Sequence, residues 1–361
     1  MRNLQGGRNV LVFGTGTIGE PLLVLFAKKR EQLGIDNIIF TKLTPRPFDI
    51  PKVDALCRQG ALFAVPEEKI HEFNEQGMRP SLSLEEALGL AKVVVDCTPK
   101  KVGRENKEKI YKNYESSING FLAQGSEKGF GKPYAYGIGH DVLEKAGQYI
   151  WIVSCNTHAI SNILWTIAFD QGEKGPDNLQ LGDFVLVRRV GDISQVKGQP
   201  SIAVDPHTVE HGTHQAEDAC TFFQSALGWH LPLFSSAMIG PHTDMHTTRF
   251  CLHLAEEPSR EEILRRVRRN PVNALTRKKN SNLVFSFGRD HGHCGRILNQ
   301  AVIVEETITV SSNRVYGMSF TPQDGNSLAS STAATLFFLN PEKYKARMEV
   351  LLDFPLIFSE V

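Results

Sequence analysis

The residue best suited to covalent chemistry in this 361-residue chain is Cys155, in the stretch VSCNT (153–157). The apolar run YIWIV before it predicts a buried strand, and the apolar spacing after it predicts a helix. Cys155 would then lie at a helix N-terminus, where the dipole and main-chain N–H groups favour the nucleophilic thiolate. The alternative is a buried structural thiol, the commoner role of a cysteine. The polar neighbours favour the nucleophile, and these are Ser154, Asn156 and Thr157.

Two motifs in the second half of the chain would assist a nucleophile. The segment PHTDMHTT (241–248) supplies His242 and His246 as candidates for the base that a cysteine nucleophile needs. A predicted strand ends in Arg188 and Arg189, and paired guanidinium groups suit a phosphate-bearing substrate. Arginines that serve only surface solubility would give the same pattern.

A dinucleotide-binding turn is predicted near the start of the chain. The apolar strand NVLVF (9–13) runs into GTGTIG (14–19), and a helical stretch follows. This is the GxGxxG motif in its required setting, in which the three glycines make the turn, admit the pyrophosphate and pack the helix on the strand. The predicted turn comprises Gly14, Thr15, Gly16, Thr17, Ile18 and Gly19.

The end of the second predicted strand, DNIIFTK (36–42), indicates the coenzyme. An NAD enzyme usually carries Asp or Glu there for the ribose 2′-hydroxyl. Here the residues are Thr41 and Lys42. A hydroxyl and a cation suit a 2′-phosphate, so NADP is favoured, with NAD possible. An ordinary exposed lysine is the alternative for Lys42.

Repeated strand–helix alternation in the first half predicts a doubly wound parallel sheet, and so an α/β fold. Two of its strands, KVVVDCTP (92–99) and GFLAQG (120–125), end in polar residues at the edge where a coenzyme binds. These strand-end residues are Asp96, Thr98, Pro99, Gln124 and Gly125. The spacing of Ser83 and Glu86 predicts a capping box at the start of a helix.

The second half has a different pattern. Strand-like segments, separated by few helical patterns, predict a mainly antiparallel sheet packed by one or two helices, which is an α+β arrangement. NLVFSF (282–287) is one of the predicted strands, and EEILRRVRRNP (261–271) is a predicted helix. The arginines of this helix suit an anion, but a solvated face or a subunit contact is the more usual role. They are Arg265, Arg266, Arg268 and Arg269.

Composition argues against several classes of function. Lys+Arg and Asp+Glu number 40 each, so no net field recruits nucleic acid or an anionic membrane. No apolar run is long enough to span a bilayer, and the first residues lack the core of a signal peptide, so a cytoplasmic protein is expected. The six cysteines form no CxxC pair, which predicts reduced thiols. GRDHGHCGR (288–296) lacks a second ligand pair, so a surface loop without metal is expected.

Taken together, these motifs resemble the archaeal-type (type II) phosphorylating glyceraldehyde-3-phosphate dehydrogenases. The matching motifs occur in the same order as in the family and extend from Val10 to about Ala334. They are GTGTIG, FTKLTP, VVDCTPKKVGRENK, QGSEK, VSCNT, VRRVGD, EHG at His211 and PHTDMH. It implies a Rossmann domain over residues 1–154 and 327–361, a catalytic domain over 155–326, and a homotetramer. It also implies NADP, often with NAD tolerated.

The resemblance implies roles for the matching residues. Cys155 matches the family nucleophile and His246 the general base. Arg188, Arg189 and His211 match positions expected near substrate phosphate, beside the polar residues of the nucleophile motif. The implied reaction joins Cys155 to a phosphorylated aldehyde and removes the hydroxyl proton through His246 as hydride passes to the coenzyme. Inorganic phosphate then attacks the thioester and releases an acyl phosphate.

Departures from the family pattern keep two other functions open. The family's Thr-Gly after SCNT is replaced by His158-Ala159, and the neighbours of His211 are not those of the family. These changes gather at the substrate and phosphate positions. One alternative is a related NADP-dependent semialdehyde dehydrogenase or acyl-phosphate reductase. The other is a catalytically silent, nucleotide-binding paralogue.

Overall fold

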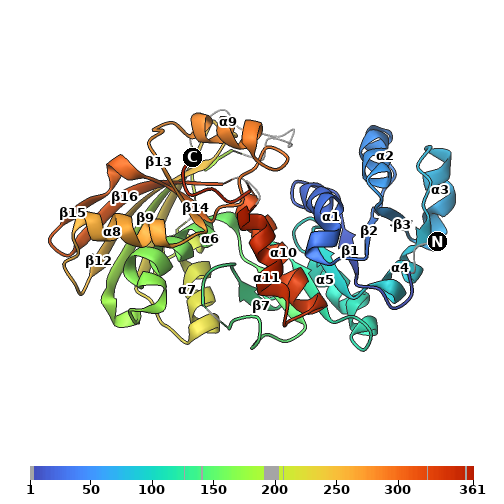
Figure 1. Cartoon of the computed structure of the whole chain (residues 1–361), viewed down its shortest axis with the longest axis horizontal. Helices are drawn as coiled ribbons and strands as arrows, with labels where there is room; N and C mark the ends of the chain where they lie inside the picture. The colour runs from blue at the N-terminus through green and yellow to red at the C-terminus, as the bar shows by residue number, and fades with distance from the viewer. Residues whose placement is uncertain are drawn as a thin grey trace. The chain divides into compact units, whose positions relative to one another are not determined.

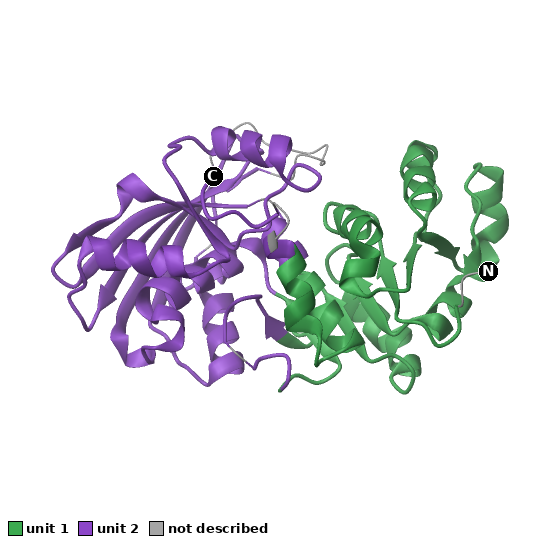
Figure 2. Cartoon of the chain, in the orientation of Figure 1, with its two compact units in different colours: residues 1–132, 145–152, 330–350 green, residues 133–144, 153–329, 351–361 purple. Residues whose placement is uncertain are grey.

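The chain alternates helices and strands along most of its length (Figure 1). The computed structural model describes residues 4–125, 127–139, 141–190, 203–205, 207–322, 324–353 and 356–361. The chain forms two compact units (Figure 2). Unit 1 contains residues 1–132, 145–152 and 330–350, and unit 2 contains residues 133–144, 153–329 and 351–361.

Unit 1 is built on an eight-stranded sheet in the order β4-β3-β2-β1-β5-β6-β8-β7. The pairings from β4 across to β8 are parallel. The inner order β3-β2-β1-β5-β6-β8 is that of a doubly wound dinucleotide-binding sheet, so the predicted Rossmann sheet is confirmed. The strands are β1 (Asn9–Phe13), β2 (Asn37–Thr41), β3 (Leu62–Val65), β4 (Leu82–Ser83), β5 (Val93–Asp96), β6 (Gly120–Ala123), β7 (Lys132–Tyr134) and β8 (Tyr149–Ile152).

Helices connect the successive strands from β1 to β6, because a parallel pair needs a long crossover. Every residue of β1, β2, β5 and β6 is buried, as expected for strands covered on both faces. The predicted capping box is confirmed, since the Ser83 and Glu86 side chains each bond the other's main-chain N–H at the start of α4. The helices of this part are α1 (Gly19–Leu33), α2 (Ile50–Arg58), α3 (Ile70–Glu75), α4 (Leu84–Leu90) and α5 (Val102–Lys109).

Unit 2 is built on a second, mainly antiparallel sheet in the order β10-β11-β9-β12-β16-β14-β13, with β15 paired to β16. Among the described strands of this second sheet, only the β11–β9 and β13–β14 pairings are parallel. The predicted α+β arrangement is thereby confirmed. The strands are β9 (Leu179–Arg189), β10 (Ala203–Val204), β11 (Leu233–Gly240), β12 (His246–Leu254), β13 (Asn273–Thr276), β14 (Ala301–Val304), β15 (Thr309–Ser311) and β16 (Arg314–Thr321).

Helices α6, α7 and α8 pack against this second sheet (Figure 1). Along β9, β11 and β12 buried positions largely alternate with more exposed ones, the pattern of a sheet with one fully covered face. Helix α10 begins in unit 2 and ends in unit 1. The remaining helices are α6 (Cys155–Ile163), α7 (His214–Leu227), α8 (Arg260–Arg269), α9 (Ser281–His291), α10 (Gly325–Leu339) and α11 (Tyr344–Asp353).

One predicted strand is wrong. Residues 282–287 belong to helix α9, whose buried residues are Val284 and Gly288. These two positions are four apart, which is the spacing of one helical face. Phe285 packs against the same buried cluster as Val284. An apolar run this short does not reveal its period, so its aromatic and β-branched residues suggested a strand.

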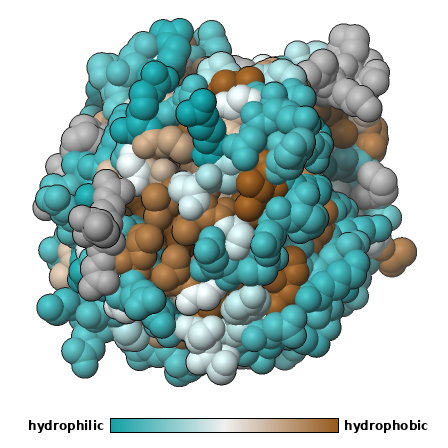
Figure 3. Space-filling model, turned by 90° about the vertical axis from the view of Figure 1, so that its right-hand side faces the viewer, coloured by the Kyte–Doolittle hydropathy of each residue, from teal (hydrophilic) through white to brown (hydrophobic). Residues whose placement is uncertain are grey.

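The surface carries both polar and apolar residues. Figure 3 shows one face on which apolar side chains gather in the middle and polar side chains surround them. Within the described ranges, no helix is both long and apolar enough to cross a bilayer. The six cysteines all lie in these ranges and none is in a disulfide, which confirms the predicted reduced thiols.

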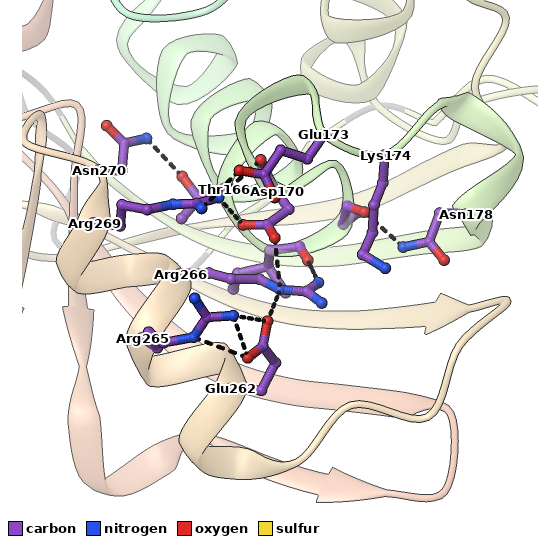
Figure 4. Close-up of polar contacts among 12 residues, drawn as sticks. Thr166, Asp170, Glu173, Lys174, Asn178, Glu262, Arg265, Arg266, Arg269 and Asn270 are labelled. Atoms are coloured by element: carbon purple, nitrogen blue, oxygen red, sulfur yellow. Dashed lines mark hydrogen bonds and ion pairs between the residues drawn. The ribbon is translucent and has the colours of Figure 1, made fainter.

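The predicted basic face of α8 is right for Arg265 and wrong for Arg266. The Arg265 side chain is 63% exposed, but that of Arg266 is 3% exposed. Arg266 donates to the Ile167 carbonyl at 2.7 Å and to Glu256 and Glu262 at 2.9 and 3.0 Å. Figure 4 shows Glu262 bonded to both arginines. A buried guanidinium needs such partners, so Arg266 is part of the core.

This arginine joins α8 to the helix that begins at Cys155. Ile167 lies in a π-helical turn, 164–168, that continues α6. Burial alone would raise the pKa of Glu256, but hydrogen bonds from Arg266, Lys174 and Asn178 lower it to about 2. The carboxylate therefore stays ionised and holds the guanidinium in place.

We predict that Arg266→Ala lowers the free energy of unfolding by about 2–5 kcal/mol, because it empties a buried site and removes the hydrogen bonds to the Ile167 carbonyl, Glu256 and Glu262. Arg265→Ala is the matched control, since it removes an exposed arginine from the same helix and should change stability little. Urea unfolding followed by circular dichroism measures both. Equal stability of the two variants would contradict the structural role of Arg266.

Candidate active site

Cys155 is the first residue of α6, at the end of the connection from β8. Ser154 caps this helix, because its side-chain oxygen accepts from the Thr157 N–H at 3.4 Å and lies 2.8 Å from the Thr157 hydroxyl. The helical ladder begins with the His158 N–H bonded to the Ser154 carbonyl at 2.8 Å. The half-buried thiol of Cys155 thus lies in the first turn, where the helix dipole favours an anion. Capping accounts for the polarity of Ser154 and Thr157.

A buried amide holds this first turn in place. Asn326 has no exposed surface, and its Nδ2 donates to the Cys155 carbonyl at 3.0 Å. The same nitrogen lies 3.4 Å from the carbonyl of Gln300, just ahead of β14. One side chain thus ties the cysteine turn to the sheet of unit 2. Asn326 carries no sequence signal of its own, because its partner is 171 positions away.

His246 begins β12 and is 6% exposed. The main-chain N–H of Arg189, at the end of the neighbouring strand β9, donates to its Nδ1 at 2.9 Å. Burial lowers the pKa of His246 well below its usual range, and the nearby charges of Arg189, Arg188 and His242 lower it further. The imidazole is therefore neutral around pH 7.

A chain of contacts links Cys155 and His246 at one end of this sheet. The Arg189 side chain lies 3.5 Å from the Asp324 carboxylate. Asp324 is two positions before Asn326, which bonds to Cys155. His246 pairs with Thr321 on β16, close to the same segment. The structure therefore brings the nucleophile candidate, the histidine and Arg189 to the same end of unit 2.

Arg188 pairs with the Asp205 carboxylate at this same end of β9. His211 lies elsewhere. Its Nδ1 donates to the Leu233 carbonyl at 3.2 Å. Leu233 pairs with Gly182, seven residues before Arg189 on β9, and this length of strand spans about 23 Å. The structure thus does not bring His211 together with Arg188, Arg189 and His246.

The glycine turn of unit 1 fits a dinucleotide. Gly14 has a φ of 86°, in the left-handed region that favours glycine. A Cβ on Gly19 would lie 2.1 Å from the Gly14 carbonyl oxygen, so α1 packs too closely for a side chain. A Cβ on Gly16 would meet no described atom within 4 Å. The chain thus leaves space where the pyrophosphate of a dinucleotide would approach.

Lys42 is not the exposed lysine of the alternative interpretation. Its side chain is 13% exposed, and Nζ lies 2.9 Å from the Asp49 carboxylate and 3.1 Å from the Thr15 hydroxyl of the glycine turn. A second lysine, Lys52, donates to the Thr15 carbonyl at 3.0 Å and pairs with Glu20. Asp49 and Lys52 were not among the predicted site residues. The sequence feature that could have indicated them is an acidic and a basic residue three positions apart, in the segment that follows the second strand.

The strand-end residues of unit 1 are bonded within that unit. Asp96 accepts from the Thr98 N–H and Asn106 at 2.9 Å each, and from the hydroxyl of Tyr111. The buried carboxylate thus fixes the turn that follows β5.

The other strand end is held in the same way. Gln124 Nε2 donates to the Ser331 hydroxyl at 3.0 Å, and the Gly125 carbonyl accepts from Trp151 at 3.1 Å. Pro99 accepts from the Val102 N–H at 3.1 Å. Glu127, which was not predicted, accepts from the Lys101 and Arg104 N–H groups at the start of α5, where a carboxylate is stabilised by the helix dipole.

The sheet order and the glycine turn together define unit 1 as a dinucleotide-binding domain of the Rossmann type. No group of three or more His, Cys, Asp or Glu within the described ranges is placed to hold a metal ion. The class of protein that these features define is a dinucleotide-binding protein with a cysteine in the first turn of a helix, and a neutral histidine, in a second domain.

Comparison with known proteins narrows this class. The chain is 28% identical to glyceraldehyde-3-phosphate dehydrogenase of Methanococcus maripaludis, over 88% of this chain and 89% of the relative. It is 28% identical to the protein of that name from Methanocaldococcus jannaschii, over 87% and 89%. Identity to the one from Sulfolobus acidocaldarius is 27%, over 86% and 85%. No family model matches the chain. The resemblance to archaeal-type glyceraldehyde-3-phosphate dehydrogenases is confirmed.

We predict that Asn326→Asp slows alkylation of Cys155 by iodoacetamide at pH 7 by about ten-fold, because a carboxylate facing the first turn of α6 disfavours the thiolate. Peptide mass spectrometry separates Cys155 from the other cysteines. Asn340→Asp is the control, since the Asn340 side chain makes a local hydrogen bond to the Lys343 N–H and lies outside the candidate site. An unchanged rate in Asn326→Asp would contradict the role given to this amide.

Proposed function

We propose that this protein oxidises glyceraldehyde 3-phosphate, or a close phosphorylated aldehyde, to an acyl phosphate with NADP and inorganic phosphate. Relatives that bear the name of that activity align over more than four-fifths of the chain. The observation that carries the proposal concerns Cys155 at the start of α6. Its carbonyl bonds to Asn326, two positions after the Asp324 that pairs with Arg189, and the N–H of Arg189 bonds to His246.

In the proposed reaction the Cys155 thiolate adds to the aldehyde carbon and forms a hemithioacetal. A nicotinamide coenzyme, when bound, supplies the hydride acceptor. Main-chain N–H groups in the first turn of α6 stabilise the oxyanion that develops on the substrate. Loss of hydride leaves a thioester on Cys155, and inorganic phosphate displaces the sulfur to give the acyl phosphate. His246 acts on the substrate oxygen.

The glycine turn, Thr41 and Lys42 would hold the coenzyme. The hydroxyl of Thr41 is buried and has no hydrogen-bond partner among the described residues, so it has a hydrogen bond to offer. Arg188 is the better of the two arginines for substrate phosphate, since its side chain is 28% exposed and that of Arg189 only 5%. Both already pair with a carboxylate, so a bound phosphate would compete with Asp205 or Asp324.

The alternative functions have less support. The semialdehyde alternative was suggested by His158, but this side chain is fully buried and its Nδ1 donates to the Ser154 carbonyl at 3.0 Å. Burial lowers the pKa of His158 to about 4. His158 is thus a neutral part of the helix start. The silent paralogue would require an unreactive Cys155. A homotetramer, which the resemblance implies, and a cytoplasmic location, which the apolar pattern of the sequence predicts, are part of the proposal.

We predict that the wild-type protein reduces NADP in the presence of glyceraldehyde 3-phosphate and inorganic phosphate, and that Cys155→Ser abolishes this. The growth of absorbance from the reduced nicotinamide measures the rate. Cys294→Ser is the control, because Cys294 is exposed and should leave the rate unchanged. If the wild type is inactive with this aldehyde but active with others, or active without phosphate, the substrate assignment is wrong.

We predict that Lys42→Ala raises the KM for NADP by about ten-fold or more and changes the KM for NAD little, because only NADP carries the 2′-phosphate. Asp49→Asn should shift the preference further towards NADP, since it removes an anion that would repel that phosphate. Lys28→Ala, an exposed lysine on α1, is the control. Equal effects of Lys42→Ala on the two coenzymes would contradict this assignment.

A further inference from the structure

The carbonyl that begins helix α6 accepts two hydrogen bonds from one residue. The His158 N–H donates to the Ser154 carbonyl at 2.8 Å, which is the ordinary helical bond, and the Nδ1 of His158 lies 3.0 Å from the same oxygen. A carbonyl can only accept, so Nδ1 carries a hydrogen and is the second donor. The ring has no exposed surface, so water does not compete for this contact.

The two bonds also fix the direction of the Cys155 N–H. This N–H and the Ser154 carbonyl belong to one peptide unit, which is planar and trans, so the two groups point in opposite directions. Cys155 is the first residue of α6, and its N–H therefore lies ahead of the helical ladder. Asn326 acts in the same way on the next peptide unit, because its bond to the Cys155 carbonyl fixes the N–H of Asn156.

We propose that His158 is a positioning residue, which holds the main-chain N–H of Cys155 towards the oxyanion that forms when the sulfur adds to a carbonyl carbon. This inference rests on the proposed function and gives a role to a residue that its reaction steps do not use. The oxygen of the adduct is bonded to the carbon that the sulfur holds, so a donor from the same residue can reach it. Such a donor is effective only when its direction is set before the reaction.

The neutral ring separates this role from an effect on the thiolate. Burial lowers the pKa of His158 to about 4, and hydrogen bonds to the main chain of Ser154 and Val153 oppose this only in part. At pH 7 the ring thus brings no positive charge to the first turn of α6, and it cannot favour the thiolate by charge. Loss of His158 should therefore slow reactions that form an oxyanion more than reactions that do not.

Two reactions of Cys155 differ in this respect. With 4-nitrophenyl acetate, the thiolate sulfur bonds to the ester carbon and the carbonyl electron pair moves to oxygen as an oxyanion. Return of that pair expels 4-nitrophenolate and leaves a thioester. With iodoacetamide, the sulfur displaces iodide at a saturated carbon, and no oxyanion forms. The ratio of the two rates at Cys155, followed by peptide mass spectrometry, therefore measures stabilisation of the oxyanion.

A pair of variants with nearly equal volume isolates the hydrogen bond. In His158→Thr the hydroxyl can bond to the carbonyl four residues earlier, and in His158→Val a methyl group replaces that hydroxyl. We expect His158→Val to lower the ratio of acylation to alkylation by about five-fold, the fold-change of one moderate hydrogen bond. His158→Thr should keep the ratio within about two-fold of the wild type, because one donor to the carbonyl is restored.

Ile160→Val is the control, because it shortens another buried side chain of α6 and should leave the ratio unchanged. Equal ratios in His158→Thr and His158→Val would overturn the inference, and so would an equal fall in Ile160→Val. A wild-type Cys155 that is alkylated but not acylated would overturn it too. If either variant of the pair unfolds below the assay temperature, His158→Asn and His158→Leu replace them, since the asparagine amide lies where Nδ1 lies and leucine has a similar shape without a donor.

These measurements use neither an aldehyde nor a coenzyme, so the inference and the proposed function can fail separately. A wild type that oxidises no phosphorylated aldehyde, together with the expected ratios, would contradict the proposed function and support the role of His158. A wild type that oxidises glyceraldehyde 3-phosphate, together with equal ratios in the pair, would support the proposed function and overturn this inference.

Discussion

The candidate site in unit 2 depends on the register between β9 and β12. Thr247 pairs with Val187, and beyond this pair the main-chain N–H of Arg189 bonds to the ring of His246. A shift of one residue would turn His246 to the other face of the sheet. The orientation of the histidine is therefore set by main-chain pairing and not by a loop. The same strand end presents Arg188, and through Asp324 it approaches the segment that holds Cys155.

Local sequence patterns were sufficient for part of this site. The glycine turn and the start of α6 could be predicted because a strand, a turn or cap, and a helix follow one another within about 20 residues. Asn326 could not, because its contact with Cys155 joins distant positions. The segment 282–287 was wrongly predicted as a strand. Burial of Val284 and Gly288 on one face favours a helix there, but that burial depends on tertiary packing and cannot be read from the segment alone. His211 matched a family motif, yet the register of β11 separates it from Arg189.

Ion pairs explain why a cluster of basic residues in the sequence is a poor predictor of an anion-binding site. Arg188 pairs with Asp205, Arg189 with Asp324, and Lys42 with Asp49. A cation that is partly or fully buried needs such a partner, because an isolated charge is poorly solvated there. Each pair is close to neutral until a ligand arrives. A phosphate must therefore offer more than charge, and the hydroxyl of Thr41 or of Thr15 offers a directed hydrogen bond of that kind beside Lys42.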